Sequence, residues 1–305
     1  MLPKKLKNGE SIGIISPSGP VTQEHMDQFN AGVTFFKSLG FKVSVSKNAF
    51  SNSLEYSATP QEKVDDIHAM FADNEIKAIV CSQGWSNSNS ILPLLNFEII
   101  KNNPKIFLGI SDITVLLNAI YYKTGLVTFH GNDVMWGFGR NYTDYDKKEF
   151  VERLLEKKIG KINQNSEWKT VRNGISEGIL VWWNLNCIVK LLATQKYWPD
   201  FKNKILILED FDMSASPDRI DCDLHILKQH KVFDQIQGLW IGHYNHESKI
   251  PYEDIVMNVV KEYNFPILKC DDFGHNTPNT VIPIGTKVRL DATNKQVIIL
   301  ENCVQ

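Results

Sequence analysis

The sequence lacks several features that would place it in a special class of protein. Its five cysteines are scattered and form no Cys-x-x-Cys pair, which favours a reducing compartment and argues against a zinc site. No apolar run approaches the roughly 20 residues of a membrane span. The basic residues 1–7 are followed by polar ones rather than by the apolar core of a signal peptide. We therefore expect a cytoplasmic protein.

The chain also lacks an excess of charge of either sign. Its formal net charge is −2 over 305 residues, whereas nucleic acid or an anionic membrane as partner would favour a basic face. Hydrophobic residues make up 43%, which is ordinary for a globular chain, and the length suits about two domains. We expect a globular protein that binds neither nucleic acid nor membrane.

The first half of the chain alternates strand and helix patterns. Strands are expected over residues 11–16, 42–45, 78–81 and 106–108. Helices are expected over 23–39 and from Thr59, whose spacing to Glu62 is that of a capping box, through Ile67 and Met70. Such alternation is typical of a parallel sheet with both faces covered.

The second half has a different pattern. A charged helix is expected over residues 146–158, followed by a polar stretch, and further strands are expected near residues 180, 206, 239 and 288. We therefore predict an α/β domain over 1–160, a linker over 161–175 and a smaller mixed α/β domain over 176–305.

The most informative stretch is Gly109–Thr114, where an apolar strand meets an apolar helix. A serine at a tight strand-to-helix turn projects its hydroxyl above the sheet edge, beside helical N–H groups that lack intrahelical partners. Ser111 is thus a candidate nucleophile, and the amide of Asp112 supplies half of an oxyanion hole. The alternative is that Ser111 or Asp112 only caps the helix.

Two later segments supply the other groups that a serine nucleophile needs. Glu209 follows the apolar strand 205–208, and His275 heads the turn-rich loop 273–279. A hydroxyl needs a base to take its proton, and the base needs a partner to hold its tautomer. The order Ser, Glu, His matches α/β-hydrolases, but Ile113 stands where their serine turn requires glycine. These residues predict a Ser-His-Glu hydrolase of another fold.

The end of the third strand is a candidate for the rest of the oxyanion hole. Ligands bind at the carboxyl ends of strands in open α/β sheets, and glycine allows close approach of backbone amides. We expect an amide of Gly84 or Trp85 to act with that of Asp112. The alternative is an ordinary turn in which glycine is needed only because the backbone adopts a φ angle that other residues disfavour.

Aromatic and histidine residues provide weaker candidates. Trp182, Trp183 and Asn184 are candidates for lining the substrate cleft; the alternative for the two indoles is that they pack in a core. Trp85 and Trp136 lie in glycine-bearing loops and are better candidates for substrate contact. His243–His246 has the wrong spacing for helical metal ligands, and no cysteine or carboxylate cluster completes a set, so no metal site is expected.

Several segments together resemble one family nearly end to end. They are Leu6–Ser18, Gly84–Asn89, Gly109–Thr114, Lys123–Gly131, Leu208–Asp210 and Gly274–Asn279. The chain is similar to the LD-carboxypeptidase family of serine peptidases, which includes the microcin C immunity proteins. Two differences stand out: Gln83 replaces the first of two glycines usual before Trp85, and Trp182-Trp183 replaces a glycine pair.

The resemblance implies more than the residues do alone. It implies Ser111 as nucleophile, His275 as general base and then acid, and Glu209 as the residue that orients the histidine. It further implies a flavodoxin-like first domain, a homodimer, and catalysis without cofactor.

Three hypotheses about the function remain. The Ser86–Asn89 run favours the immunity branch, which cleaves an amide between an aminoacyl group and a nucleotide-like moiety. The first alternative is a murein LD-carboxypeptidase that releases terminal D-alanine. The second is a noncatalytic ligand-binding protein on the same scaffold, against which the presence of all three triad residues argues.

Overall fold

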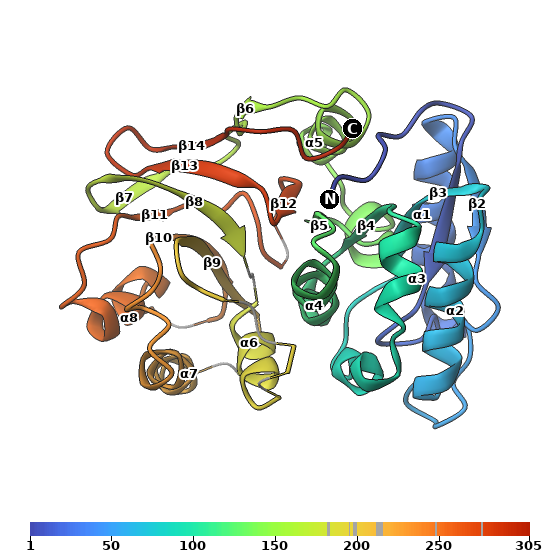
Figure 1. Cartoon of the computed structure of the whole chain (residues 1–305), viewed down its shortest axis with the longest axis horizontal. Helices are drawn as coiled ribbons and strands as arrows, with labels where there is room; N and C mark the ends of the chain where they lie inside the picture. Colours follow the sequence, from blue (N-terminus) through green and yellow to red (C-terminus); the bar gives the residue numbers. More distant parts are fainter. Residues whose placement is uncertain (182–183, 195, 198–199, 212–215, 248, 276) are drawn as a thin grey trace. The chain divides into compact units, whose positions relative to one another are not determined.

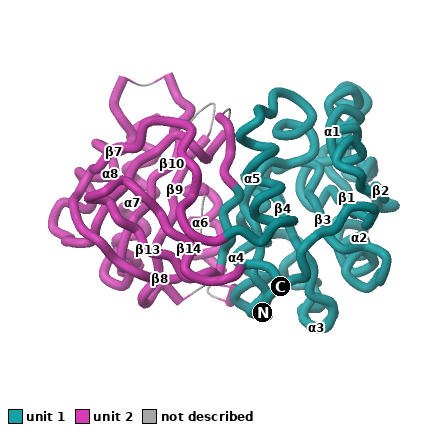
Figure 2. The backbone as a smooth tube through the Cα atoms, turned by 90° about the horizontal axis from the view of Figure 1, so that it is seen from above, with its two compact units in different colours: residues 1–158, 281–284, 303–305 teal, residues 159–280, 285–302 magenta. Residues whose placement is uncertain are grey.

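The computed structural model describes residues 1–181, 184–194, 196–197, 200–211, 216–247, 249–275 and 277–305. The chain divides into two compact units, which Figure 2 shows in different colours. Unit 1 comprises residues 1–158, 281–284 and 303–305, and unit 2 comprises residues 159–280 and 285–302. Residues 281–284 join unit 1 because they form a strand of its sheet.

Unit 1 is built on a six-stranded sheet with the order β12-β5-β4-β3-β1-β2. The first five strands in the chain are parallel, and β12 runs antiparallel to β5. The parallel sheet expected from the sequence is therefore confirmed. Its strands are β1 (Ser11–Ile15), β2 (Lys42–Val45), β3 (Ile76–Cys81), β4 (Ile106–Gly109), β5 (Thr128–His130) and β12 (Ile282–Ile284).

Helices cover both faces of this sheet (Figure 1). On one face the Cβ position of Gly13 points to Met70 of α2, and on the other Ile12 and Ile14 join a core with Phe36, Phe138 and Phe150. The helices of unit 1 are α1 (Met26–Ser38), α2 (Pro60–Ala72), α3 (Phe97–Asn102), α4 (Thr114–Thr124) and α5 (Asp144–Leu154). Short 3-10 helices span Gln23–His25, Ser88–Leu94 and Ser111–Ile113, and a single π-helical turn spans Val134–Phe138.

Backbone hydrogen bonds connect the carboxyl ends of β1 and β3 with the π-helical turn that follows β5. The N–H of Ser82 donates to the carbonyl of Ile15 over 2.8 Å, and the N–H of Met135 donates to the carbonyl of Ser82 over 3.0 Å. A parallel sheet brings the ends of its strands to one edge, so loops that are distant in sequence meet there. Ser111 follows β4 at this same edge.

Unit 2 contains an eight-stranded mixed sheet with the order β6-β14-β13-β8-β9-β10-β11-β7. Strands β8 to β11 are parallel, and antiparallel strands flank them on both sides. The strands are β6 (Gly160–Lys161), β7 (Lys169–Arg172), β8 (Ile175–Val181), β9 (Lys204–Phe211), β10 (Gly238–Asn245), β11 (Ile267–Lys269), β13 (Lys287–Asp291) and β14 (Gln296–Ile299). The strands expected near residues 180, 206, 239 and 288 are all present.

The helices of unit 2 among the described residues are α6 (Leu185–Leu192), α7 (Pro217–Gln229) and α8 (Tyr252–Val260). The structure differs from the expected linker over 161–175. This segment contains β7, which pairs with β11, and Trp168, which is buried. The polar side chains of Lys169–Arg172 hide the strand from sequence patterns because an edge strand needs few apolar residues.

Within the residues that the structure describes, no helix is both long and apolar enough to cross a membrane.

Candidate active site

Ser111 occupies a backbone conformation that is unusual for a residue with a side chain. Its φ angle is 62°, in the left-handed region, and such a conformation costs of order 1–3 kcal/mol and clusters at functional sites. The residue lies between β4 and α4 in the 3-10 turn Ser111–Ile113. The turn therefore holds Ser111 in a strained position directly after a buried strand.

Helix capping does not explain this serine. The residues at the cap positions of the 3-10 turn and of α4 are Ile110 and Ile113, and neither position has a side-chain capping bond. The side chain of Asp112 instead holds neighbouring loops. It accepts hydrogen bonds from the hydroxyl of Ser18 over 2.6 Å and from the N–H of Ser88 over 2.7 Å.

Gly84 approaches the Ser111 turn closely. A Cβ atom on Gly84 would lie 2.6 Å from the Cβ of Ser111 and 3.3 Å from the backbone nitrogen of Asp112. Gly84 is not among the residues with positive φ, so close approach, and not the φ angle, explains the glycine. The Ser111 side chain thus lies beside the backbone of both Gly84 and Asp112, while the side chain of Trp85 is 68% exposed.

Residues of the polar run Ser86–Asn89 form hydrogen bonds with Lys63 and with the Ser111 turn. The Oδ1 atom of Asn87 accepts a 2.8 Å hydrogen bond from Lys63, and the hydroxyl of Ser88 donates to the carbonyl of Asp112 over 2.7 Å. Burial lowers the pKa of Lys63 to about 8, while the nearby Asp112 carboxylate acts to raise it. Ser88 therefore supports the turn directly, whereas Asn87 connects the polar run to Lys63.

In unit 2, Glu209 and His275 are in direct contact. The Oε2 atom of Glu209 lies 2.9 Å from the Nδ1 atom of His275, and Glu209 is fully buried two residues before the end of β9. Its other oxygen, Oε1, accepts a 2.7 Å hydrogen bond from the side chain of Asn184. Both carboxylate oxygens are thus held, which fixes the orientation of the carboxylate toward the imidazole.

Asn184 is itself buried. Its side-chain oxygen accepts from the N–H of Cys187, so the same amide caps α6 and donates to Glu209. Sequence reasoning took Asn184 as a substrate contact and missed this bond. Trp182 and Trp183, predicted with it, lie outside the described residues.

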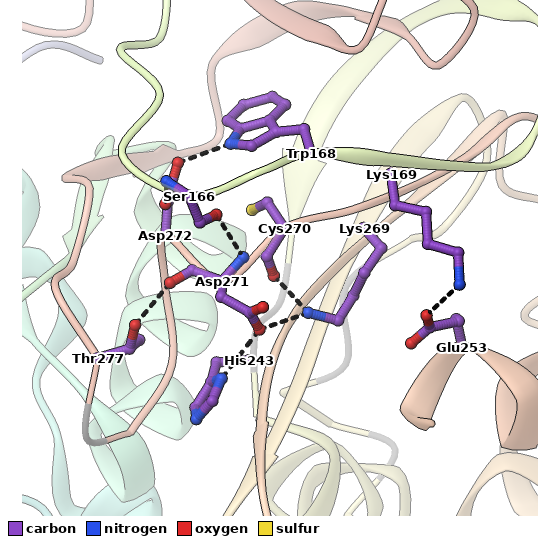
Figure 3. A network of polar contacts seen from close by, with 10 residues as sticks. All are labelled: Ser166, Trp168, Lys169, His243, Glu253, Lys269, Cys270, Asp271, Asp272 and Thr277. Carbon is purple, nitrogen blue, oxygen red and sulfur yellow. Dashed lines mark hydrogen bonds and ion pairs between the residues drawn. The ribbon is translucent and has the colours of Figure 1, made fainter. Parts of the chain in front are cut away.

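The loop that carries His275 is hydrogen-bonded at both ends, and Figure 3 shows the contacts of Asp271 and Asp272 at its start. The buried carboxylate of Asp272 accepts hydrogen bonds from the indole of Trp168 over 2.6 Å and from the N–H of Ser166 over 2.6 Å. The N–H of Thr280 donates to the carbonyl of Asp272 over 2.7 Å, which closes the loop. Within it, Thr277 donates to the carbonyl of Asp271 over 2.6 Å. His275 therefore lies in a loop whose two ends are held by hydrogen bonds.

A charged cluster lies at the base of this loop. The Asp271 carboxylate contacts His243 over 2.9 Å and Lys269 over 2.5 Å, and these contacts, that with His243 first, lower the pKa of Asp271 to about 2. His243 thus has a carboxylate partner. Among the described residues, no three His, Cys, Asp or Glu side chains are arranged to hold a metal ion.

Comparison with known proteins identifies relatives along the whole chain. Residues 12–131 match the family model described as LD-carboxypeptidase N-terminal domain, and residues 177–290 match the LD-carboxypeptidase C-terminal domain. A probable murein peptide carboxypeptidase of Bacillus subtilis is 30% identical over 97% of this chain and 93% of its own. The microcin C7 self-immunity protein MccF of Escherichia coli is also 30% identical, over 99% and 96%.

A solved structure shows the same fold. The structure of MccF in complex with aspartyl sulfamoyl adenosine superposes with a TM-score of 0.93 at 27% identity and covers 100% of both chains.

Proposed function

Since this chain belongs to the LD-carboxypeptidase family and is a serine carboxypeptidase-like hydrolase, we propose that its catalytic triad is Ser111, His275 and Glu209. The observation that carries this proposal is the 2.9 Å contact between His275 and the buried Glu209. The strained turn at Ser111 supports the assignment of the nucleophile.

The reaction divides into two steps. The Oγ atom of Ser111 attacks the carbonyl carbon of an amide while Nε2 of His275 takes the hydroxyl proton. When the C–N bond breaks, the histidine returns this proton to the leaving nitrogen. Water then hydrolyses the acyl-enzyme with the histidine again as base. Glu209 stabilises the imidazolium ion, and Asn184 is a positioning residue for Glu209.

The developing oxyanion needs hydrogen-bond donors beside Ser111. We assign this role to the N–H of Asp112 together with an N–H of Gly84 or Trp85. The closeness of Gly84 to both the serine hydroxyl and the Asp112 nitrogen supports this assignment. One such donor is worth about 10²–10³ in kcat.

The substrate that we favour is an aminoacyl or peptidyl amide with a nucleotide-like leaving group. The match to MccF, whose structures hold aspartyl sulfamoyl adenosine or glutamyl sulfamoyl guanosine, supports it. The second candidate is a murein peptide with terminal D-alanine, because the murein carboxypeptidase relative has the same 30% identity as MccF. We further expect a homodimer, which the mass measured by light scattering tests. We expect it in the cytoplasm, which cell fractionation tests.

Mass spectrometry of products tests the substrate. The purified protein is incubated with aspartyl sulfamoyl adenosine and, separately, with a murein tetrapeptide. We expect aspartate and sulfamoyl adenosine from the first, with no product from the Ser111→Ala variant. Ser38→Ala, at an exposed serine on α1, is the matched control and keeps full activity. Release of D-alanine from the tetrapeptide, without turnover of the nucleotide conjugate, would establish the second candidate.

A further inference from the structure

The side chain of Gln83, the residue before Gly84, is buried. Its side-chain amide joins two other loops. The Nε2 atom donates to the carbonyl of Pro20 over 2.6 Å, and the Oε1 atom accepts from the indole nitrogen of Trp136 over 2.8 Å. The next residue, Gly84, lies against Ser111. A glycine at position 83 could form neither side-chain bond.

The segment that carries Trp136 is fixed along its length. Trp136 is in the π-helical turn Val134–Phe138, and isolated π turns are frequent at functional sites. The Asp133 carboxylate accepts from the N–H groups of Trp136 and Gly137 over 2.7 and 2.8 Å. A side chain on Gly137 or Gly139 would collide with atoms at 2.4 Å or 2.0 Å. The loop is therefore closely packed and holds its tryptophan in one place.

The indole of Trp136 is held by three neighbours and keeps part of its surface open. The Gln83 bond satisfies its only N–H, His25 contacts the ring in an edge-on arrangement at 4.9 Å, and 38% of the residue is exposed. The guanidinium of Arg140 lies over one face of the ring, 5.8 Å from its centre. An indole whose N–H is satisfied offers the rest of its apolar ring surface for contact, and here a cation lies at that surface.

We propose that Gln83 is a positioning residue that fixes Trp136 as one wall of the leaving-group site, which accepts a planar group with an adjacent negative charge. This inference rests on the proposed function and deepens it. Stacking of the planar group on the indole and attraction of its anionic neighbour to Arg140 both act on the part of the substrate that departs. Gln83 and Trp136 should therefore affect binding of that part and leave the chemical step at Ser111 unchanged.

Three variants test the proposal. Gln83→Met keeps the length of the side chain and removes both bonds, Trp136→Phe removes the indole N–H and narrows the wall, and the double variant combines them. Gln61→Met, at an exposed glutamine on α2, is the matched control. Kinetics are measured with aspartyl sulfamoyl adenosine and with a small aspartyl amide that lacks the nucleoside.

Each single variant should raise KM for the nucleotide conjugate about tenfold, with kcat changed less than threefold and both constants for the small amide unchanged. The double variant should be no worse than Trp136→Phe, because both changes remove the same hydrogen bond. Additive effects, or equal losses with both substrates, would overturn the proposal and leave Gln83 a purely structural residue.

Equilibrium binding separates this inference from the proposed function. In a Ser111→Ala background, isothermal titration calorimetry with aspartyl sulfamoyl adenosine should show about tenfold weaker binding when Gln83→Met is added. This result can hold even if the wild-type protein fails to cleave the conjugate, in which case only the proposed function is wrong. Equal affinity with and without Gln83→Met would overturn the inference, whatever the hydrolytic activity.

Discussion

The phenyl ring of Phe211 lies nearly flat against the imidazole of His275, with 4.4 Å between the ring centres and 17° between the ring planes. Phe211 is the last residue of β9, and Glu209 lies two residues before it in the same strand. The histidine is therefore held on its edge by a carboxylate and on its face by an aromatic ring. Stacking of the two rings therefore restricts the orientation of the imidazole beside the Glu209 carboxylate.

Replacing Phe211 by leucine should consequently lower the rate of hydrolysis. We expect Phe211→Leu to lower kcat severalfold with KM little changed, because the imidazole loses the ring that restricts its orientation. Steady-state kinetics with an aminoacyl amide measure this effect, and Phe211→Tyr, which retains the ring face, should keep the wild-type kcat. An unchanged kcat in Phe211→Leu would show that the ring does not position the histidine.

The nucleophile and the base should behave as one unit. Ser111→Ala and His275→Ala should each lower kcat by about 10⁴-fold or more, and the double variant should be hardly worse than either. Single-turnover kinetics of the three variants measure this. Losses that multiply in the double variant would mean that the two residues act in different steps.

Glu209→Gln should cost less than loss of the serine. It leaves the nucleophile and base present but replaces an acceptor of the histidine Nδ1–H by an amide, which favours the wrong tautomer. We expect kcat to fall by about 10²–10⁴ with KM little changed. A Glu209→Gln enzyme with wild-type kcat would remove Glu209 from the mechanism.

Asp210, next to Glu209, should make the stability of the protein depend on pH. Burial, followed by the charge of Glu209, raises its pKa from 3.8 to about 7. Because the folded state prefers the protonated acid, this stabilising preference is complete below pH 3.8 and is lost as pH rises toward 7. The Tm of Asp210→Asn minus that of the wild type should therefore increase between pH 5 and pH 8. A constant difference, measured by calorimetry, would contradict the raised pKa.

Chelators and thiol reductants should leave hydrolysis unchanged. A serine acyl-enzyme route uses the protein's own base and amides, and four of the five cysteines are buried. The assay compares rates before and after dialysis against EDTA, with and without added zinc. Activity that disappears on dialysis and returns with zinc would replace the serine mechanism by a metal-dependent one.

Local patterns in the sequence were sufficient to predict the strands that precede or carry the site residues. The strands β4 and β9 and the capping box at Thr59 are present where residue spacing predicts them, although β9 extends beyond Leu208 to Phe211. Apolar periodicity and cap residues act over a few positions, so they can be read from the chain directly. The edge strand Lys169–Arg172 was missed because its side chains are mostly polar.

The supporting contacts were not predictable in the same way. Gln83 meets Trp136 across 53 positions, Asn184 meets Glu209 across 25, and Glu209 meets His275 across 66. No local pattern marks the first two pairs, and the third was anticipated only because serine chemistry requires a base and its partner.

The sequence by itself therefore determined the fold class, the family and the three residue types that amide hydrolysis by a serine requires. The tertiary structure decided what surrounds them: the glycine backbone beside Ser111, the amide on the second oxygen of Glu209, and the ring against His275. The physical reason is that chemistry restricts which residues can act, whereas strand order alone brings distant side chains within hydrogen-bond range.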